Sequence, residues 1–108
     1  IFTSPDCVLF FGLRGHAMES CDFGESWQEL ETGTLSSLAG GTFHDGVVVL
    51  VGNNGVVLVR EDGNISEHQH SSGVDFAAVV PHGSERFLLV GEEGVHYYPE
   101  QVAEESGQ

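Results

Sequence analysis

The sequence predicts an all-β chain in which a four-stranded antiparallel unit recurs about every 40 residues. Three similar apolar runs, VLFF, VVLV and FLLV, each end at a Gly-x-x-Gly pair, and these pairs begin at Gly12, Gly52 and Gly91. The first glycines are therefore 40 and 39 residues apart. The chain also holds 15 glycines but one methionine, a composition that favours short strands and turns over helices. We expect one strand order to recur along the chain.

Each unit is expected to run strand, Gly-x-x-Gly turn, strand, Asp-bearing turn, strand, connection and strand. Residues 47–51 form the clearest strand, because such an apolar run bounded by turn residues is typical of a strand buried on both faces. The paired glycines suit a tight hairpin, since residues at its corners often need a positive φ. Four short strands in about 40 residues are typical of one β-propeller blade.

The repeat divides the chain into blade units at about residues 1–34, 35–73 and 74–98, followed by a polar tail at 99–108. Gln101 stands where the next Asp-bearing turn would be expected, so the repeat ends there. About two and a half blades cannot close a ring by themselves. We therefore expect a C-terminal fragment of a larger propeller, or a chain that self-associates to complete one.

The charge of the chain argues against two kinds of partner. Seventeen acidic residues stand against three arginines and no lysine, for a net charge of −14. Nucleic acids and anionic membrane surfaces are bound by clustered basic side chains, so neither is expected. No apolar run is long enough to cross a membrane, so no membrane insertion is expected. The expected partner is a protein, and the expected location is periplasmic or secreted, although no signal peptide is visible.

The two cysteines, Cys7 and Cys21, leave two interpretations open. A hairpin centred on residues 12–15 would bring position 7 close to positions 20 and 21, so a disulfide could form. Alternatively, both cysteines pack in strands as small apolar side chains. Neither shows a local sign of activation as a nucleophile, and no Gly-x-Ser-x-Gly motif is present. No catalytic residue and no cofactor are therefore expected.

The most specific motif in the chain is Ser20-Cys-Asp22-Phe-Gly24-Glu-Ser26-Trp27. In a turn, the carboxylate of Asp22 is expected to accept backbone N–H bonds from the residues just after it, and Ser20 can brace the same loop with its hydroxyl. Gly24 supplies a backbone angle that a side chain would resist, and Trp27 covers the turn with apolar surface. The expected result is a rigid outer corner.

This motif, together with the Gly-x-x-Gly hairpin and the Thr34-Leu-x-x-Leu38 segment, resembles the Asp-box (BNR) β-propellers. It is most similar to the repeat of the photosystem II assembly or stability factors, including their non-photosynthetic bacterial relatives. The resemblance covers about residues 1–98. A degenerate second box keeps Asp62 and Gly63 but lacks the tryptophan, so that corner is expected to be less rigid. Propellers of this family act as platforms for proteins during complex assembly, so the resemblance implies a non-enzymatic scaffold.

Asp-boxes also occur in sialidases, so the alternative is the C-terminal part of a glycan-cleaving propeller enzyme. Sialidases hold the substrate carboxylate with three arginines, and this chain has Arg14, Arg60 and Arg86. These three occupy different points of the repeat, and no Arg-Ile-Pro motif precedes them. In that family the Asp-box is a structural corner away from the active site. The scaffold interpretation is therefore favoured over the enzyme.

A histidine pair is the candidate metal site. His68 and His70 are expected on one face of a strand, a spacing that could hold zinc or copper if His44 or His82 supplied a third ligand. Solvated histidines are the more common case, so no metal is expected.

A tyrosine pair is the candidate partner contact. Tyr97 and Tyr98 belong to the last strand before the tail, and successive strand residues face opposite sides of a sheet. One of the two tyrosines therefore packs inward, and the other could contact a partner or another copy of the chain.

Overall fold

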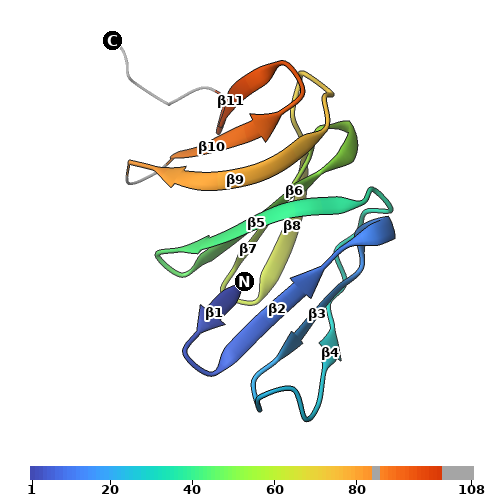
Figure 1. Ribbon diagram of the computed structural model, residues 1–108, viewed down its shortest axis with the longest axis vertical. Helices are drawn as coiled ribbons and strands as arrows, with labels where there is room; N and C mark the ends of the chain where they lie inside the picture. The colour runs from blue at the N-terminus through green and yellow to red at the C-terminus, as the bar shows by residue number, and fades with distance from the viewer. Residues whose placement is uncertain (84–85, 101–108) are drawn as a thin grey trace.

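The computed structural model describes residues 1–83 and 86–100 and shows three antiparallel sheets (Figure 1). The all-β prediction is confirmed. Within every sheet, strands that follow one another in the chain are hydrogen-bonded neighbours. The first sheet contains β1 (Phe2–Ser4), β2 (Cys7–Phe11), β3 (Ala17–Ser20) and β4 (Gln28–Glu29). The second contains β5 (Leu38–His44), β6 (Val47–Gly52), β7 (Val56–Glu61) and β8 (Asn64–Gln69). The third contains β9 (Phe76–His82), β10 (Arg86–Gly91) and β11 (Gly94–Tyr98).

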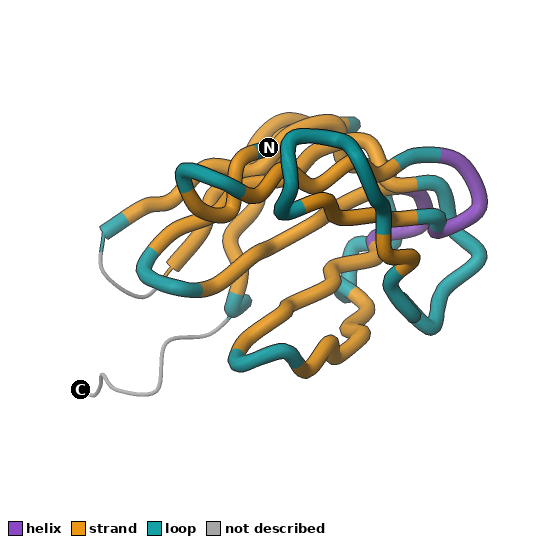
Figure 2. The backbone as a smooth tube through the Cα atoms, turned by 90° about the horizontal axis from the view of Figure 1, so that it is seen from below, coloured by secondary structure: helices purple, strands orange, loops and turns teal. Residues whose placement is uncertain are grey.

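Each sheet lies within one of the three repeat units that the sequence defines. The second sheet lies between the other two, so the sheets form a stack in chain order (Figure 1). Two short 3₁₀ turns, η1 (Leu13–Gly15) and η2 (Asn53–Gly55), occupy equivalent hairpins and lie toward the same end of the molecule (Figure 2). Most of the tail and Gln101 fall outside the described residues. Among the described residues, no helix has the length and apolar character needed to cross a membrane.

The two glycines of a Gly-x-x-Gly pair have different roles. Gly55 has a φ of 78°, the left-handed region that the sequence-based prediction assigned to hairpin corners. Gly52 is extended instead, with a φ of −169°, so the prediction is wrong for this first glycine. A Cβ atom at Gly52 would lie 1.9 Å from the carbonyl oxygen of Ser37, and one at Gly91 would lie 2.1 Å from that of Asp75. At Gly52 and Gly91 the first glycine is therefore required by the close approach of two backbones, whereas a Cβ atom at Gly12 would meet nothing within 4 Å.

Two separate apolar cores hold the stack together. The first lies between the first and second sheets and includes Leu9 and Leu50; the second lies between the second and third sheets and includes Val51 and Leu89. Strand β6 contributes to both cores through alternate residues, and Val48, Val49, Leu50 and Val51 are each between 0 and 4% exposed. The prediction that residues 47–51 are buried on both faces is confirmed for 48–51.

Candidate functional site

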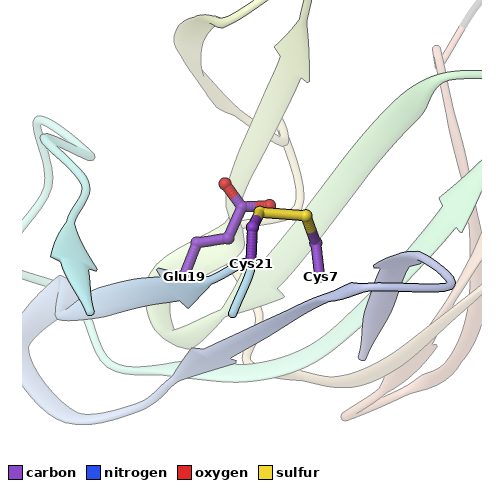
Figure 3. Close-up of side chains that lie close together, drawn as sticks. All are labelled: Cys7, Glu19 and Cys21. Carbon is purple, nitrogen blue, oxygen red and sulfur yellow. A yellow bond between two sulfur atoms is a disulfide. The ribbon is translucent and has the colours of Figure 1, made fainter. Parts of the chain in front are cut away.

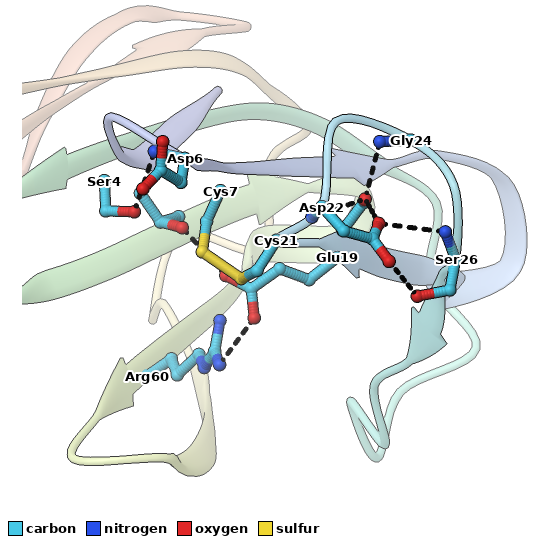
Figure 4. Close-up of a disulfide and its surroundings, with 11 residues drawn as sticks. Ser4, Asp6, Cys7, Glu19, Cys21, Asp22, Gly24, Ser26 and Arg60 are labelled. Carbon is cyan, nitrogen blue, oxygen red and sulfur yellow. Dashed lines mark hydrogen bonds and ion pairs between the residues drawn. A yellow bond between two sulfur atoms is a disulfide. The ribbon is translucent and has the colours of Figure 1, made fainter.

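The corner between β3 and β4 is built around Asp22, whose carboxylate accepts three hydrogen bonds (Figure 4). The Ser20 hydroxyl donates to Oδ1 at 2.8 Å, the Ser26 backbone N–H donates to Oδ1 at 2.9 Å, and the Ser26 hydroxyl donates to Oδ2 at 2.5 Å. The backbone N–H of Gly24 donates to Ser20 Oγ at 2.9 Å. The hydrogen bonds from Ser26, followed by that from Ser20, lower the pKa of Asp22 from 3.8 to about 2. This carboxylate is thus held ionised by the corner's own residues.

The same corner exposes aromatic side chains. Phe23 and Gly24 both have left-handed backbone conformations, with φ values of 61° and 88°. This conformation is uncommon for a residue with a bulky side chain, and it directs Phe23 into solvent, where 84% of its surface is exposed. Trp27 donates its indole N–H to the Gly24 carbonyl at 3.1 Å and stacks on Phe10 of β2 with ring centroids 5.1 Å apart. The tryptophan thereby closes the corner onto the first sheet.

A disulfide between Cys7 and Cys21 closes the base of this corner (Figure 3). It joins the first residue of β2 to the residue after β3, so the structure decides for the disulfide and against separate packing of the two cysteines. Glu19 lies beside it, and the ligand atoms of these three residues are within 4.8 Å of one another. A metal would need free thiolates here, and disulfide sulfurs are not thiolates, so this group is not a metal site.

An ion pair links β3, beside the corner, to the second sheet (Figure 4). The Arg60 guanidinium lies 2.9 Å from one carboxylate oxygen of Glu19, and the Thr3 hydroxyl donates to the other at 2.8 Å. The hydrogen bond from Arg60 is the main cause that holds the pKa of Glu19 below its ordinary 4.5. Both residues line a cleft of about 340 Å³ between the first two sheets, together with Phe43 and Asp62. Sequence reasoning missed this pair.

Asp62 and Gly63 form a different kind of corner. They have φ values of 54° and 82° and are the two central residues of a tight turn between β7 and β8. The strands pair up to the turn itself, with Glu61 opposite Asn64. A two-residue loop with both φ values positive matches the twist of the flanking strands. The expectation of a less rigid corner rested on the missing tryptophan, but this turn is closed by its backbone instead.

Within the described part of the chain, His68 and His70 are not brought together with a third metal-ligating side chain. The ring of His68 is tilted against that of Tyr98 with ring centroids 5.5 Å apart, and its Nε2 lies 3.1 Å from Ser66 Oγ. Among residues 1–83 and 86–100, the two histidines belong to no group of three metal-ligating side chains. The proposed third ligands are engaged elsewhere: His44 lies 3.3 Å from the carboxylate of Asp45. The histidine pair is part of the packing around the second and third sheets.

His70 is a buried ring whose two nitrogens lie within hydrogen-bond distance of backbone groups. Only 6% of its surface is exposed. The Ser72 backbone N–H donates to Nδ1 at 3.2 Å, so Nδ1 is an acceptor and Nε2 carries the proton. Nε2 lies 3.2 Å from the carbonyl oxygen of Tyr97, to which it donates. Both ring nitrogens therefore bind protein groups, which leaves neither available to a metal.

The two tyrosines of β11 face opposite sides of the third sheet, as strand geometry predicts. Tyr98 packs against the second core, and burial raises the pKa of its phenol. Tyr97 is 41% exposed on the outer side, with the Arg86 guanidinium 4.5 Å from its ring centroid and the His82 ring tilted against it at 5.6 Å between centroids. Tyr97 is therefore the member of the pair that is free to make a further contact.

The three arginines have three separate environments. Arg60 is paired with Glu19 between the first two sheets, whereas Arg86 stacks on Tyr97 on the outer side of the third sheet. Arg14 lies in the η1 turn of the first hairpin, where its backbone N–H donates to Ser37 Oγ at 3.3 Å. Three guanidinium groups that hold one substrate carboxylate must converge, and these three arginines lie on different elements, with the Arg60 and Arg86 guanidinium groups bound to different residues.

Comparisons with known proteins identified no relative of this chain. No protein-family model matches the chain, and a search of curated proteins found no match. The chemistry that the residues themselves offer is an exposed aromatic group on a covalently closed, hydrogen-bonded corner. Such an arrangement is suited to contact with another macromolecule.

Proposed function

We propose that this chain is a non-enzymatic scaffold of β-propeller blades that binds a partner protein through the corner around Asp22. The observation that carries the proposal is Phe23, which is 84% exposed at the tip of a corner closed by the Cys7–Cys21 disulfide. Aromatic side chains supply much of the binding energy at protein interfaces, and a group already fixed in place loses little conformational entropy on binding. The ring of Phe23 is exposed, and the backbone that carries it is held by the hydrogen bonds and the disulfide of the corner.

The blade architecture is supported by the repeat and by the way in which the sheets stack. Two four-stranded sheets and one three-stranded sheet follow one another with the same strand order, and each neighbouring pair shares an apolar core. Propeller blades are four-stranded sheets that pack face to face around a channel. Three such blades are part of a ring, which further blades or another copy of the chain would complete.

An Asp-box propeller similar to the photosystem II assembly factors is the family that fits these features best. Its Asp-bearing corner would correspond to Ser20, Asp22, Gly24, Ser26 and Trp27, and a platform role in complex assembly agrees with an exposed, rigid corner. A disulfide is stable in an oxidising compartment, which favours a periplasmic or secreted location.

Site-specific photo-crosslinking tests the proposed contact. A photoreactive phenylalanine analogue at position 23 should capture a partner in extracts of the source cells, whereas the same analogue at Leu35, which is 86% exposed outside the corner, should not. With the captured partner purified, Phe23→Ala should weaken binding by at least about tenfold, and Leu35→Ala should leave it unchanged. Equal capture at both positions, or unchanged affinity of Phe23→Ala, would show that the corner is not the contact.

A turnover screen tests the enzymatic alternative. Fluorogenic sialidase and glycosidase substrates should show no hydrolysis that depends on Arg14, Arg60 or Arg86. A rate that falls when Arg60 or Arg86 is replaced by methionine, with the fold intact by circular dichroism, would contradict the scaffold and favour the glycan-cleaving enzyme.

A further inference from the structure

The repeat gives every sheet two distinct faces. In each sheet, the residues one and three positions before the first glycine of the Gly-x-x-Gly pair point to the same side. We call this side the forward face. These residues are Leu9 and Phe11, Val49 and Val51, and Leu88 and Val90. The rear face bears the residues four and two positions before the same glycine. These are Val8 and Phe10, Val48 and Leu50, and Phe87 and Leu89. Alternate residues of a strand point to opposite faces, so the two sets are separate.

Both contacts inside the chain join a forward face to the next rear face. Leu9 and Phe11 of the first sheet share the first core with Leu50 of the second sheet. Val51 of the second sheet shares the second core with Leu89 of the third sheet. The same pairing is thus made twice, with the same repeat positions on each side.

Among residues 1–83 and 86–100, one face at each end of the stack packs against no neighbouring sheet. On the rear face of the first sheet, Phe10 is 56% exposed, whereas its repeat equivalent Leu50 is 4% exposed. On the forward face of the third sheet, Val90 is 40% exposed, whereas its equivalent Val51 is fully buried at 0%. These values hold for the part of the chain that the structure describes. The two faces lie at opposite ends of the stack (Figure 1).

Neighbouring strands extend each exposed face. Met18, opposite Phe10 in the strand register, is 42% exposed, and Phe2 adds a second aromatic ring that is 70% exposed. At the other end, Val95 lies opposite Val90 and is 57% exposed. The remaining exposed apolar side chains of the forward face are Val80 and Tyr97, which both lie opposite Leu88. Contiguous apolar surface of this kind marks a contact with another molecule.

We propose that a second copy of the chain covers these faces, so that the forward face of the third sheet in one copy packs on the rear face of the first sheet in another. Each copy supplies both halves of a contact that it already makes twice internally. A head-to-tail contact of this kind closes into a ring when the rotation allows it. The three described sheets of each of two copies make six, within the range of about four to eight blades in propellers. The inference rests on the stacking of the sheets and not on partner binding by Phe23.

The net charge of the chain determines how association through this contact should depend on salt concentration. Each copy carries a net charge of −14, so two copies repel each other through solvent. The contact itself is mainly apolar, and Arg86 beside Tyr97 is the basic group on the forward face. Added salt screens the repulsion between exposed charges and leaves the apolar contact intact. Association should therefore strengthen as salt is raised, opposite to an assembly held by surface ion pairs.

Light scattering on purified full chains tests the assembly. Two single variants are compared with the wild type, and each places one charge on one of the two faces. Wild-type protein should have the mass of at least two chains, whereas Phe10→Glu and Val90→Glu should each have the mass of one. Leu35→Glu places the same charge on an 86% exposed apolar residue outside both faces and should associate as wild type does. Met18→Glu and Val95→Glu form a second pair if either first variant loses its circular dichroism spectrum.

Mixing the two variants separates a head-to-tail contact from other arrangements. Phe10→Glu keeps an intact forward face and Val90→Glu keeps an intact rear face, so the mixture should form a complex of two chains, one of each variant. A monomeric wild-type protein would overturn the proposal. Association of Phe10→Glu with itself would overturn it too, because two forward faces would then be in contact. Failure of the folded variants to combine would exclude the forward-to-rear pairing.

Discussion

The corner at Asp22 and the turn at Asp62 occupy the same place in neighbouring repeat units, 40 residues apart, yet they are built differently. Residues 21–27 separate β3 from β4, and side chains and a disulfide hold them. Two residues with positive φ values separate β7 from β8. The outer strand differs accordingly, since β4 spans Gln28–Glu29 and β8 spans Asn64–Gln69.

This difference teaches how a repeat can carry a functional element without changing its fold. The short turn is closed by backbone geometry and extends the sheet. The long corner has less strand pairing, but hydrogen bonds among its own residues hold its backbone. It can therefore present Phe23 to solvent. Four changes should break or sharpen this contrast, and they are ordered below from the largest expected effect to the smallest.

Removal of the disulfide should have the largest effect. In Cys7→Ala/Cys21→Ala, the unfolded chain regains the freedom of a loop whose ends are 14 residues apart, which should lower the free energy of unfolding by about 3 kcal/mol. Urea unfolding followed by fluorescence measures it, with chemically reduced wild type as the control. Amide exchange should accelerate at Ser26 and stay unchanged at Asn64. Equal acceleration at both would mean that the corner has no local stability of its own.

Replacement of Gly63 should come next. The φ of this residue is 82° and a Cβ atom there would meet nothing within 4 Å, so Gly63→Ala introduces backbone strain alone. The left-handed conformation should lower the free energy of unfolding by about 1–2 kcal/mol. Gly63→Asn is the matched control, because asparagine adopts this conformation more readily, and it should be less destabilised. Equal losses for both variants in urea unfolding would point to a cause other than the backbone angle.

Loss of the tryptophan hydrogen bond should have a smaller effect. Trp27→Phe keeps an aromatic ring to stack on Phe10 but removes the N–H that donates to the Gly24 carbonyl. One such bond contributes about 1 kcal/mol net, and less where water can replace it. Trp27→Ala should lose the stacking as well, by about another 0.5–1.5 kcal/mol. Indistinguishable unfolding midpoints for the two variants would show that the ring contact adds nothing to the corner.

Much of this contrast could be predicted from local sequence. The Gly-x-x-Gly repeat predicts the strands and the period, and the bonds of Asp22 follow from its position in a turn. The backbone of Gly52 could not be predicted, because its need for glycine comes from Ser37 in the preceding connection, which only the folded sheet brings near.

The contacts between sheets could not be predicted from the sequence. Glu19 and Arg60 are 41 residues apart, and their pairing requires knowing which faces of the two sheets meet. The repeat register nevertheless held a signal for this contact. Glu19 is four residues after Gly15 and Arg60 is five after Gly55, so the two side chains lie on opposite faces of equivalent strands. The same limit applies to Cys7 and Cys21, whose proximity follows from a hairpin but whose bonding depends on side-chain direction.

The smallest expected effect is the pH dependence of the Asp22 corner, because this carboxylate is only half-buried and remains in contact with water. Its pKa is about 2 in the folded protein, against an ordinary value of 3.8. A carboxyl group whose pKa is lower in the folded state stabilises the fold only while it is ionised. That contribution is fully present above pH 3.8 and is lost as the pH falls through about 2.

Acid titration of two matched variants should therefore separate the two corners. Below about pH 4, the free energy of unfolding of the wild type should fall more steeply than that of Asp22→Asn, which has no carboxylate to protonate at this position. Asp62→Asn should follow the wild type, because its turn is closed by the backbone. Urea titrations across this range give the three curves. If wild type and Asp22→Asn stayed parallel, the hydrogen bonds would not distinguish the charged from the neutral side chain, and the disulfide alone would account for the rigidity of the corner.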